Sequence, residues 1–494
     1  RELLDLDPQG DLQNALNEHV ASGDIIDDEG KFYLPYLFRA ENSIADFVST
    51  RCQLLTASPI PEQIVNRALE EAEMELGIRF SHEQRRAVQY AGKARMLIIT
   101  GGPGCGKTTV TRALSILFQR ANKKLLLAAP TGRAAQRLGQ VTGLPASTIH
   151  RLLKYDPHRN TFTHEINDPL IADAIIVDEA SMIDVSLGMA LFAAIAKDTT
   201  LILVGDKDQL PSVGPGKLLG DLLAIKELTS IALGQLFRRD EQSIINSIAH
   251  MINCGETPSI PEPDGVTKTD AYFLSRSSSE QLLSTVEQVV AHQIPTKFGY
   301  KLNDTMILTP SNRGPLGTIN MNTVLQERLN PAGRLDSEQR LNLHGVEYRV
   351  GDRVCQRTNN YELGGSGVFN GDLGYVYEID RSKETLTVEL WDGRLITYDK
   401  QDAMQLALAY AMTVHRAQGS EAPCVVLVLH DSHFTLLQRQ LIYTAVTRAK
   451  QLLIVIGSKR ALGLACKRTL STQRCTALQE RIQYGIRTGA TLWA

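Results

Sequence analysis

The sequence predicts an α/β protein made of two parallel-sheet units, with a small β-domain inserted into the second unit and a helical region at the start of the chain. From about residue 80, short apolar runs alternate with helical stretches, which is typical of parallel sheets covered by helices on both faces. A glycine-rich loop follows the first apolar run, and closely spaced strands interrupt the alternation between residues 345 and 400. The 494 residues are enough for about three domains.

The composition excludes several classes of protein. With 43% hydrophobic and 22% charged residues the chain is typical of a soluble globular protein, and its net charge of -3 means that a bound polyanion would need a local basic groove. Seven scattered cysteines without a C-x-x-C pair argue against a disulfide framework or a zinc ribbon and favour the reducing cytoplasm. The sequence shows no apolar run of bilayer length and no signal peptide, so we expect neither membrane attachment nor export.

Residues 1–75 form the first expected region. Helices are expected over 12–20 and 40–55, on either side of a hairpin whose strands would be 24–26 and 31–34. This order fits a winged-helix-like domain, and it also fits an ordinary hairpin beside helices. Both interpretations remain open.

Two α/β units are expected to follow. We place the first at 76–235 and the second at 236–344 and 401–494, with the inserted β-domain at 345–400. Asn-Gly and Asp-Gly dipeptides inside the insert predict tight turns between its strands. The expected strands of the two units are 96–100, 125–129, 174–177, 201–204, 306–309, 425–429 and 452–456.

The segment 101–108 reads GGPGCGKT and matches the G-x-x-x-x-G-K-[ST] loop at every required position, between an expected strand and an amphipathic helix. Its glycines let consecutive backbone N–H groups point at phosphate oxygens at the start of that helix. Lys107 would neutralise the β and γ phosphates of ATP, and Thr108 would bind Mg2+. We interpret Cys105 as a tolerated small residue rather than a reactive thiol. The residues expected to bind the nucleotide are Gly102, Pro103, Gly104, Cys105, Gly106, Lys107, Thr108 and Thr109.

Polar residues follow two further expected strands, at the sheet edge where open α/β proteins bind ligands. Asp178 and Glu179 come directly after the strand 174–177. Asp178 would hold the water shell of Mg2+, and Glu179 would orient and deprotonate the attacking water. Gln209 follows the next strand, where its side chain could sense the γ-phosphate or belong to a simple polar loop. Together with the glycine-rich loop, this pattern predicts ATP hydrolysis.

These segments, with several others, resemble a superfamily 1 helicase and specifically the RecD-like branch of superfamily 1B. The resemblance covers about residues 80–485 and implies two RecA-like domains, with an SH3-like barrel at 345–400. The motifs that carry it, in the family's order, are SHEQ at 81–84, the loop at 101–108, APTGRAA at 129–135, STIHRL at 147–152, DE at 178–179, GDKDQLP at 205–211, FR at 237–238, TVHRAQGSE at 413–421 and YTAVTRA at 443–449.

The resemblance assigns further roles at the nucleotide site. It implies that Gln84 contacts the adenine, that Arg238 and Arg448 reach the γ-phosphate from the second unit, and that Gln209 couples the nucleotide to movement. A guanidinium offered across a cleft acts only when the cleft closes, so hydrolysis would be linked to domain closure. This chain has Arg239 where the family pattern has a glutamine, a small departure beside Arg238.

The resemblance also implies that both units hold a single strand through backbone amides, hydroxyls and imidazoles, without reading its sequence. A hairpin near 154–165 would act as a pin that splits the duplex, or it is an ordinary surface hairpin. The inserted barrel would touch the strand. The expected DNA-binding residues are Pro130, Thr131, Arg133, Thr148, His150, Thr413 and His415.

The function implied by the resemblance is that of an ATP-dependent and Mg2+-dependent DNA helicase moving 5'-to-3' along single-stranded DNA. Its partners would be single-stranded DNA, tailed duplex DNA and proteins of repair or recombination. Two alternatives remain open. One is an RNA-directed superfamily 1B helicase, and the other is a non-autonomous motor or scaffold subunit of a recombination nuclease complex.

Overall fold

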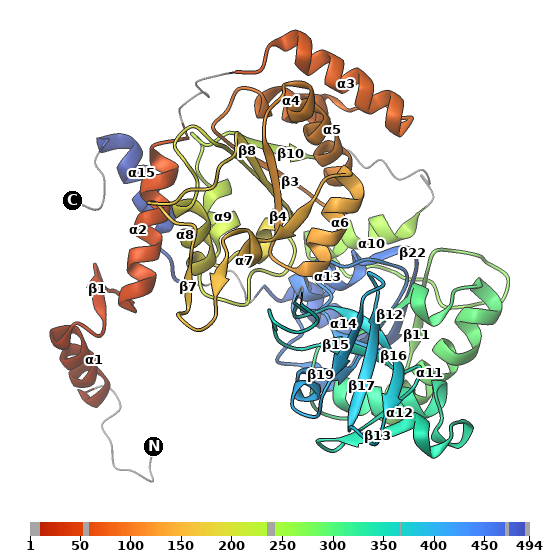
Figure 1. The fold of residues 1–494 in the computed structure, drawn as a ribbon. Helices are drawn as coiled ribbons and strands as arrows, with labels where there is room; N and C mark the ends of the chain where they lie inside the picture. Colours follow the sequence, from red (N-terminus) through yellow and green to blue (C-terminus); the bar gives the residue numbers. More distant parts are fainter. Residues whose placement is uncertain (1–9, 53–58, 235–242, 366, 470–473, 490–494) are drawn as a thin grey trace.

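The fold is given by a computed structural model that describes residues 10–52, 59–234, 243–365, 367–469 and 474–489 (Figure 1). The N-terminal region consists of three helices and a two-stranded hairpin. Its second helix begins at Pro35 rather than at the expected Ala40, because the fixed φ of proline suits the first turn of a helix. The elements are α1 (Gly10–Ser22), β1 (Ile26–Asp28), β2 (Lys31–Tyr33), α2 (Pro35–Ser49) and α3 (Glu62–Leu76).

The first α/β unit is a six-stranded parallel sheet with the strand order β10-β3-β9-β8-β4-β5. Separate apolar clusters cover its two faces, which is why its central strands are continuous apolar runs. The strands are β3 (Met96–Gly101), β4 (Leu125–Ala129), β5 (Ala146–Thr148), β8 (Ala174–Val177), β9 (Thr200–Gly205) and β10 (Ser230–Leu233). The helices are α4 (His82–Ala91), α5 (Lys107–Arg120), α6 (Gly132–Thr142), α7 (Ile149–Leu152), α8 (Val185–Ala193) and α9 (Leu218–Leu223).

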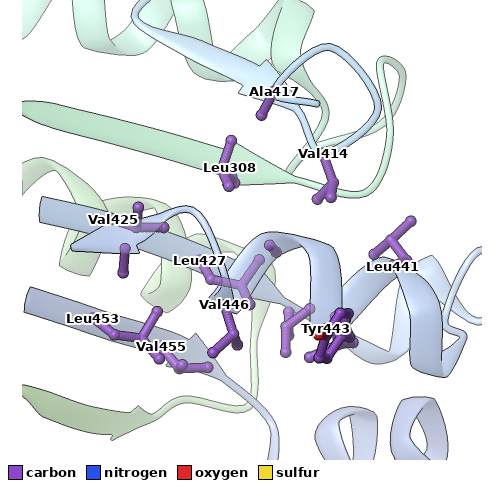
Figure 2. Close-up of a cluster of buried hydrophobic side chains, with 14 of the residues drawn as sticks. Leu308, Val414, Ala417, Val425, Leu427, Leu441, Tyr443, Val446, Leu453 and Val455 are labelled. Atoms are coloured by element: carbon purple, nitrogen blue, oxygen red, sulfur yellow. The ribbon is translucent and has the colours of Figure 1, made fainter. Parts of the chain in front are cut away.

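The second α/β unit is a five-stranded parallel sheet with the strand order β11-β22-β21-β12-β20. Figure 2 shows part of its core, where side chains from three of these strands meet Leu441, Tyr443 and Val446 of helix α13. The strands are β11 (Ala271–Ser275), β12 (Thr305–Thr309), β20 (Ala411–Thr413), β21 (Ala422–Leu429) and β22 (Ala449–Gly457). The helices are α10 (Ile244–Cys254), α11 (Ser279–Gln288), α12 (Thr318–Leu329), α13 (Arg439–Val446) and α14 (Lys459–Lys467).

The inserted β-domain is a five-stranded antiparallel sheet with the order β18-β17-β16-β15-β19 and an apolar core of its own. A short hairpin precedes it, and Tyr348 of that hairpin is buried in the same core. The last strand lies beyond the expected limit of residue 400, because it pairs with β15 before the chain re-enters the second unit. The strands are β13 (Arg340–Leu343), β14 (Val346–Arg349), β15 (Arg353–Gln356), β16 (Leu373–Asp380), β17 (Thr385–Leu390), β18 (Leu395–Tyr398) and β19 (Leu406–Leu408).

The end of the chain does not stay with the second unit. Helix α15 (Leu478–Thr488) lies beside helix α2, so the last segment packs on the N-terminal region and the first unit (Figure 1). Leu478 and Ile482 are buried in the core that also contains Ile44 of α2. None of the helices in the described part of the chain combines the length and the apolarity that crossing a membrane requires.

Candidate nucleotide site and strand path

The glycine-rich loop joins strand β3 to helix α5 in a conformation that requires glycine. Gly104 and Gly106 have φ values of 74° and 81°, in the left-handed region. A Cβ atom at Gly106 would also lie 2.2 Å from Nε2 of Gln84, so the loop and that side chain fit closely together. The backbone is thereby shaped to present its N–H groups at the start of α5.

Lys107 folds back over this loop. Its Nζ atom donates hydrogen bonds to the carbonyl oxygens of Gly101 (2.5 Å) and Gly102 (3.0 Å). Burial raises the pKa of the neighbouring Cys105 thiol, and the positive charge of Lys107 opposes this shift only in part. A reactive thiol needs a lowered pKa, so the structure favours a structural role for Cys105.

A cavity of about 390 Å³ lies in front of the loop and is lined by both α/β units. The first unit contributes the loop, the pair after strand β8 and Gln209, while the second unit contributes residues from two segments on the opposite wall. Basic groups suited to phosphates and acidic groups suited to a metal therefore share one cleft. The lining residues are Gly102, Pro103, Gly104, Gly106, Lys107, Thr108, Thr109, Arg137, Asp178, Glu179, Gln209, Glu421, Thr447, Arg448 and Lys450.

The acidic pair is held by an uncommon backbone turn. Glu179 has a φ of 53°, which is rare for a residue other than glycine, and its N–H donates to Oδ1 of Asp178 at 2.8 Å. Burial raises the pKa of Asp178, with the charge of Glu179 as the second cause. A nearby cation would favour the ionised carboxylate, so this donor set fits Mg2+ held by Thr108 and Asp178 together with phosphate oxygens.

Gln209 lies at the boundary between the two units. Its Nε2 donates to Oδ2 of Asp206 (3.3 Å), and the hydroxyl of Tyr443 from the second unit donates to the same oxygen (3.0 Å). The Oε1 atom of Gln209 is buried and has no hydrogen-bond partner among the described residues. This acceptor, beside the cavity, is suited to a water molecule or a nucleotide group.

Arg448 lies between helix α13 and strand β22 and lines the cavity, although its side chain is almost completely buried. Its guanidinium donates to the carbonyl oxygens of Thr444 (3.1 Å) and Ser420 (3.0 Å) and to the hydroxyl of Thr447 (3.2 Å). The second expected arginine, Arg238, lies outside the described residues together with Arg239.

Sequence reasoning did not single out Arg137 and Lys450, which also line the cavity. Arg137 on helix α6 forms an ion pair with Glu421 of the second unit (2.7 Å), and Lys450 contacts the same carboxylate at 3.5 Å. The sequence could have pointed to Arg137, because it lies one turn after Arg133 on the same helix.

Gln84 is placed differently from the rest of the expected nucleotide site. It caps helix α4: its Oε1 accepts from the N–H of Ser81 (3.0 Å), and its Nε2 donates to the carbonyl of Cys105 (3.4 Å). The side chain is buried against the loop and does not line the cavity. An adenine contact would require this amide to exchange a partner.

The three threonines expected to bind DNA share one local geometry. The hydroxyls of Thr131, Thr148 and Thr413 each accept a backbone N–H three residues further on. A hydroxyl that accepts such a bond still carries a proton to donate to a phosphate oxygen. Gly419 brings two of these segments together, because a Cβ atom there would lie 3.2 Å from the hydroxyl of Thr131. Pro130 immediately precedes that threonine.

Aromatic rings link His150 to the hairpin that strands β6 (Tyr155–Asp156) and β7 (Thr161–Phe162) form. The His150 ring lies 5.6 Å from that of Tyr155 and 5.7 Å from that of Phe162. Tyr155 in turn lies 6.0 Å from Tyr361 of the inserted β-domain. Burial lowers the pKa of His150 and that of His415, so both imidazoles are neutral at neutral pH.

Arg133 contacts the inserted β-domain directly. Its guanidinium lies 4.7 Å from the ring centre of Trp391, and Arg353 lies 4.9 Å from the same ring. Burial, with the charge of Arg353 as the second cause, lowers the pKa of Arg133 to about 10. Arg353 is almost completely buried, so the accessible part of this contact is Arg133 with Trp391, a cation and a ring of the kinds that bind nucleic-acid backbones and bases.

The two parallel sheets, with a glycine-rich phosphate loop on one and an arginine from the other lining the same cavity, define the class of P-loop ATPases with two RecA-like domains. Family models agree with this class along the chain. The model for an AAA domain matches residues 84–215, that for a UvrD-like helicase C-terminal domain matches 408–456, and that for an ATP-dependent RecD-like DNA helicase SH3 domain matches 321–390.

Relatives and a solved structure were also found. The ATP-dependent RecD2 DNA helicase of Deinococcus radiodurans is 35% identical over 465 residues, which are 92% of this chain and 59% of that protein. The RecBCD enzyme subunit RecD of Mycolicibacterium smegmatis is 32% identical over 435 residues, 81% of this chain and 75% of that protein. A crystal structure of Pif1 helicase from Bacteroides, in complex with ADP-AlF3 and ssDNA, matches 83% of this chain and 98% of that chain at 17% identity and a TM-score of 0.47.

The chain belongs to the RecD-like family of superfamily 1B, a family of ATP-dependent DNA helicases. The resemblance seen in the sequence is confirmed, and so is the fold class of two parallel-sheet domains with an SH3-like insert. The chain spans 59% of the length of the Deinococcus relative.

Proposed function

We propose that this chain uses ATP hydrolysis to move 5'-to-3' along single-stranded DNA and to unwind tailed duplex DNA. The cleft that the two RecA-like domains share carries the proposal, because the phosphate loop and Arg448 reach the cavity from opposite walls. A nucleotide between these walls would draw them together and shift the strand-binding segments, which meet where Gly419 approaches Thr131. Family membership supports DNA as the polymer.

The proposed roles at the nucleotide site follow from its geometry. Lys107 would exchange its loop carbonyls for the β and γ phosphates, and Thr108 and Asp178 would hold Mg2+. Glu179 would orient and deprotonate the attacking water, whose hydrogen could be accepted by the free Oε1 of Gln209. Arg448 would stabilise the charge that develops during phosphoryl transfer.

Along the strand path we propose that Pro130, Thr131, Thr148 and Thr413 hold phosphates, while His150, His415 and Arg133 contact bases or the backbone. The hydroxyl and imidazole geometry described above supports these roles. The hairpin β6–β7 is proposed as the pin that splits the duplex. The seven free thiols support a cytoplasmic location.

The substrate is tested by comparing single-stranded DNA with RNA. We expect DNA of about 20 nucleotides to raise the ATPase rate of the purified chain at least about tenfold more than RNA of the same sequence at equal concentration. Equal or greater stimulation by RNA would favour an RNA-directed helicase instead.

A second candidate is a motor subunit that acts only within a larger complex. The name of the mycobacterial relative, RecBCD enzyme subunit RecD, favours it. Measuring unwinding by the purified chain alone separates the two, because a dependent subunit would bind nucleotide and DNA without unwinding a tailed duplex.

A further inference from the structure

The segment after helix α14 contributes an arginine to a loop of the first unit. Arg474 donates from Nη1 to the carbonyl oxygens of Gly214 and Gly216, both at 2.6 Å, and from Nη2 to that of Ser212 at 2.7 Å. Three backbone carbonyls therefore surround one guanidinium. Arg474 pairs with three of the five carbonyl oxygens of the loop 212–216, and Val213 and Pro215 of this loop are exposed.

The other end of this loop leads directly to Gln209. The N–H of Leu210 donates to the hydroxyl of Thr444 (2.8 Å), and Nε2 of Gln418 donates to the carbonyl of Leu210 (3.0 Å). Both partners belong to the second unit. The segment 209–216 is thus bound to the second unit at its start and to Arg474 at its end.

Arg474 itself is fixed to the first unit and the N-terminal region. Two residues further on, the hydroxyl of Thr476 donates to Glu41 of helix α2 (2.8 Å), and the N–H of Ala477 donates to the same carboxylate (3.1 Å). The loop is also bonded to helix α8 of its own unit, since the N–H of Val185 donates to the carbonyl of Pro215 (3.1 Å). The end of the segment is therefore anchored, while its start can follow the second unit.

We propose that Arg474 is a positioning residue for ATP hydrolysis, holding the loop 212–216 still so that movement of the second unit is transmitted to Gln209. Without this anchor, the flexible glycines at 214 and 216 would let the loop change its conformation. The whole segment 209–216 would then move with Thr444 and Gln418 of the second unit. The inference rests on the proposed role of Gln209 in hydrolysis and adds a residue from outside the helicase motifs.

The experiment uses the full chain and two readouts. In Arg474→Ala, hydrogen exchange of the backbone amides 206–216, followed by mass spectrometry without nucleotide, should become faster. The kcat for ATP with single-stranded DNA should fall about tenfold while KM for ATP stays within about twofold, because binding groups remain in place. Arg474→Lys should recover part of both effects, since an ammonium group also donates to carbonyls.

The matched control is Arg468→Ala. Arg468 lies in the same connecting segment, but its guanidinium donates to the carbonyl of Phe434 within the second unit. It should leave the exchange of 206–216 and kcat unchanged. In a Gln209→Ala background, Arg474→Ala should lower kcat no further.

Two outcomes would overturn the inference and leave the proposed function standing. One is unchanged exchange at 206–216 in both Arg474 variants, and the other is a loss of kcat that simply adds to that of Gln209→Ala. A Gln209→Ala variant with full kcat would instead refute the proposed role of Gln209, and the catalytic part of the inference with it.

Discussion

Arg448 is held in place before any nucleotide arrives. Backbone carbonyls of Ser420 and Thr444 fix its guanidinium, and only 2% of the residue is exposed, although it lines the cavity. A buried cation that cannot turn toward water costs little reorganisation when negative charge develops beside it. Lys450, which also lines the cavity, has a half-exposed side chain and forms an ion pair with Glu421.

Replacing Arg448 by lysine should therefore lower kcat about a thousandfold, because an ammonium group cannot reproduce the fork of donors at the transition state. Binding of a fluorescent ADP analogue should change less than about tenfold, since the phosphate loop stays intact. The control Lys459→Gln removes an exposed lysine of helix α14 that does not line the cavity, and it should keep kcat within about threefold. Full ATPase activity in Arg448→Lys would contradict the role given to this arginine.

Among single residues, the sequence predicted those that stand in recognisable motifs. Lys107, Thr108 and Asp178 stand in motifs next to strands, and the structure places all three on the cavity. Arg137 and Arg474 could not be found in this way. Their partners, Glu421 and the carbonyls of 212–216, become neighbours only when distant parts of the chain pack together.

The segment that leads into helix α15 connects the second unit to the first unit and the N-terminal region. Helix α15 returns to the N-terminal region, where the hydroxyl of Thr476 lies 2.8 Å from Oε1 of the buried Glu41 and 3.1 Å from Oδ2 of the buried Asp221. Lys217 lies 3.5 Å from Asp221 and compensates part of its charge. Arg481 lies 3.5 Å from Glu41 in the same way. Two buried acids, each beside one base, make the docking of this segment sensitive to pH.

Burial raises the pKa of Asp221 from 3.8 to about 6. The folded protein therefore holds a proton that the unfolded chain releases, so the free energy of unfolding falls as pH rises between about 4 and 6. Asp221→Asn should remove the cost of ionising a buried carboxyl group. It should therefore stabilise the protein by up to about 2 kcal/mol at pH 7.5, and by less at about pH 5. Thermal melting at the two pH values checks this. A stabilisation that is larger at the lower pH would show the sign to be wrong.

Deleting the hairpin β6–β7 should impair duplex unwinding without impairing movement along single-stranded DNA. Replacing residues 156–161 by two glycines should reduce the unwinding rate of a tailed duplex at least about tenfold, because the wedge between the strands is gone. ATPase stimulation by single-stranded DNA should stay within about threefold, since the hairpin lies outside the nucleotide cavity. A variant that unwinds normally would mark it as an ordinary surface hairpin.

Strands were predicted better than their boundaries. The seven apolar runs all became strands of the two parallel sheets, because burial on both faces leaves a clear pattern. The four edge strands β5, β10, β11 and β20 were missed, since runs of three to five residues carry too little pattern. The return of α15 to the first unit could not be predicted either, because an amphipathic helix shows which face it buries and not which domain covers it.

In the whole molecule, a few direct contacts between the domains connect the nucleotide cleft with the residues expected to bind the strand. Gly419 touches Thr131 between the domains, and the loop after Gln209 is held by both of them. The inserted β-domain contacts the first unit at Trp391 and Tyr361, close to the expected strand residues. Closure around ATP should therefore move the strand-binding segments relative to one another.

Unwinding of duplexes with defined tails tests the proposed 5'-to-3' direction of that movement. The purified chain, ATP and Mg2+ should unwind a duplex with a 5' single-stranded tail, and Lys107→Ala should abolish the activity while leaving strand binding measurable. A duplex with only a 3' tail should stay intact. Unwinding from the 3' tail alone would refute the proposed direction, and unwinding that survives Lys107→Ala would refute its dependence on ATP hydrolysis at this site.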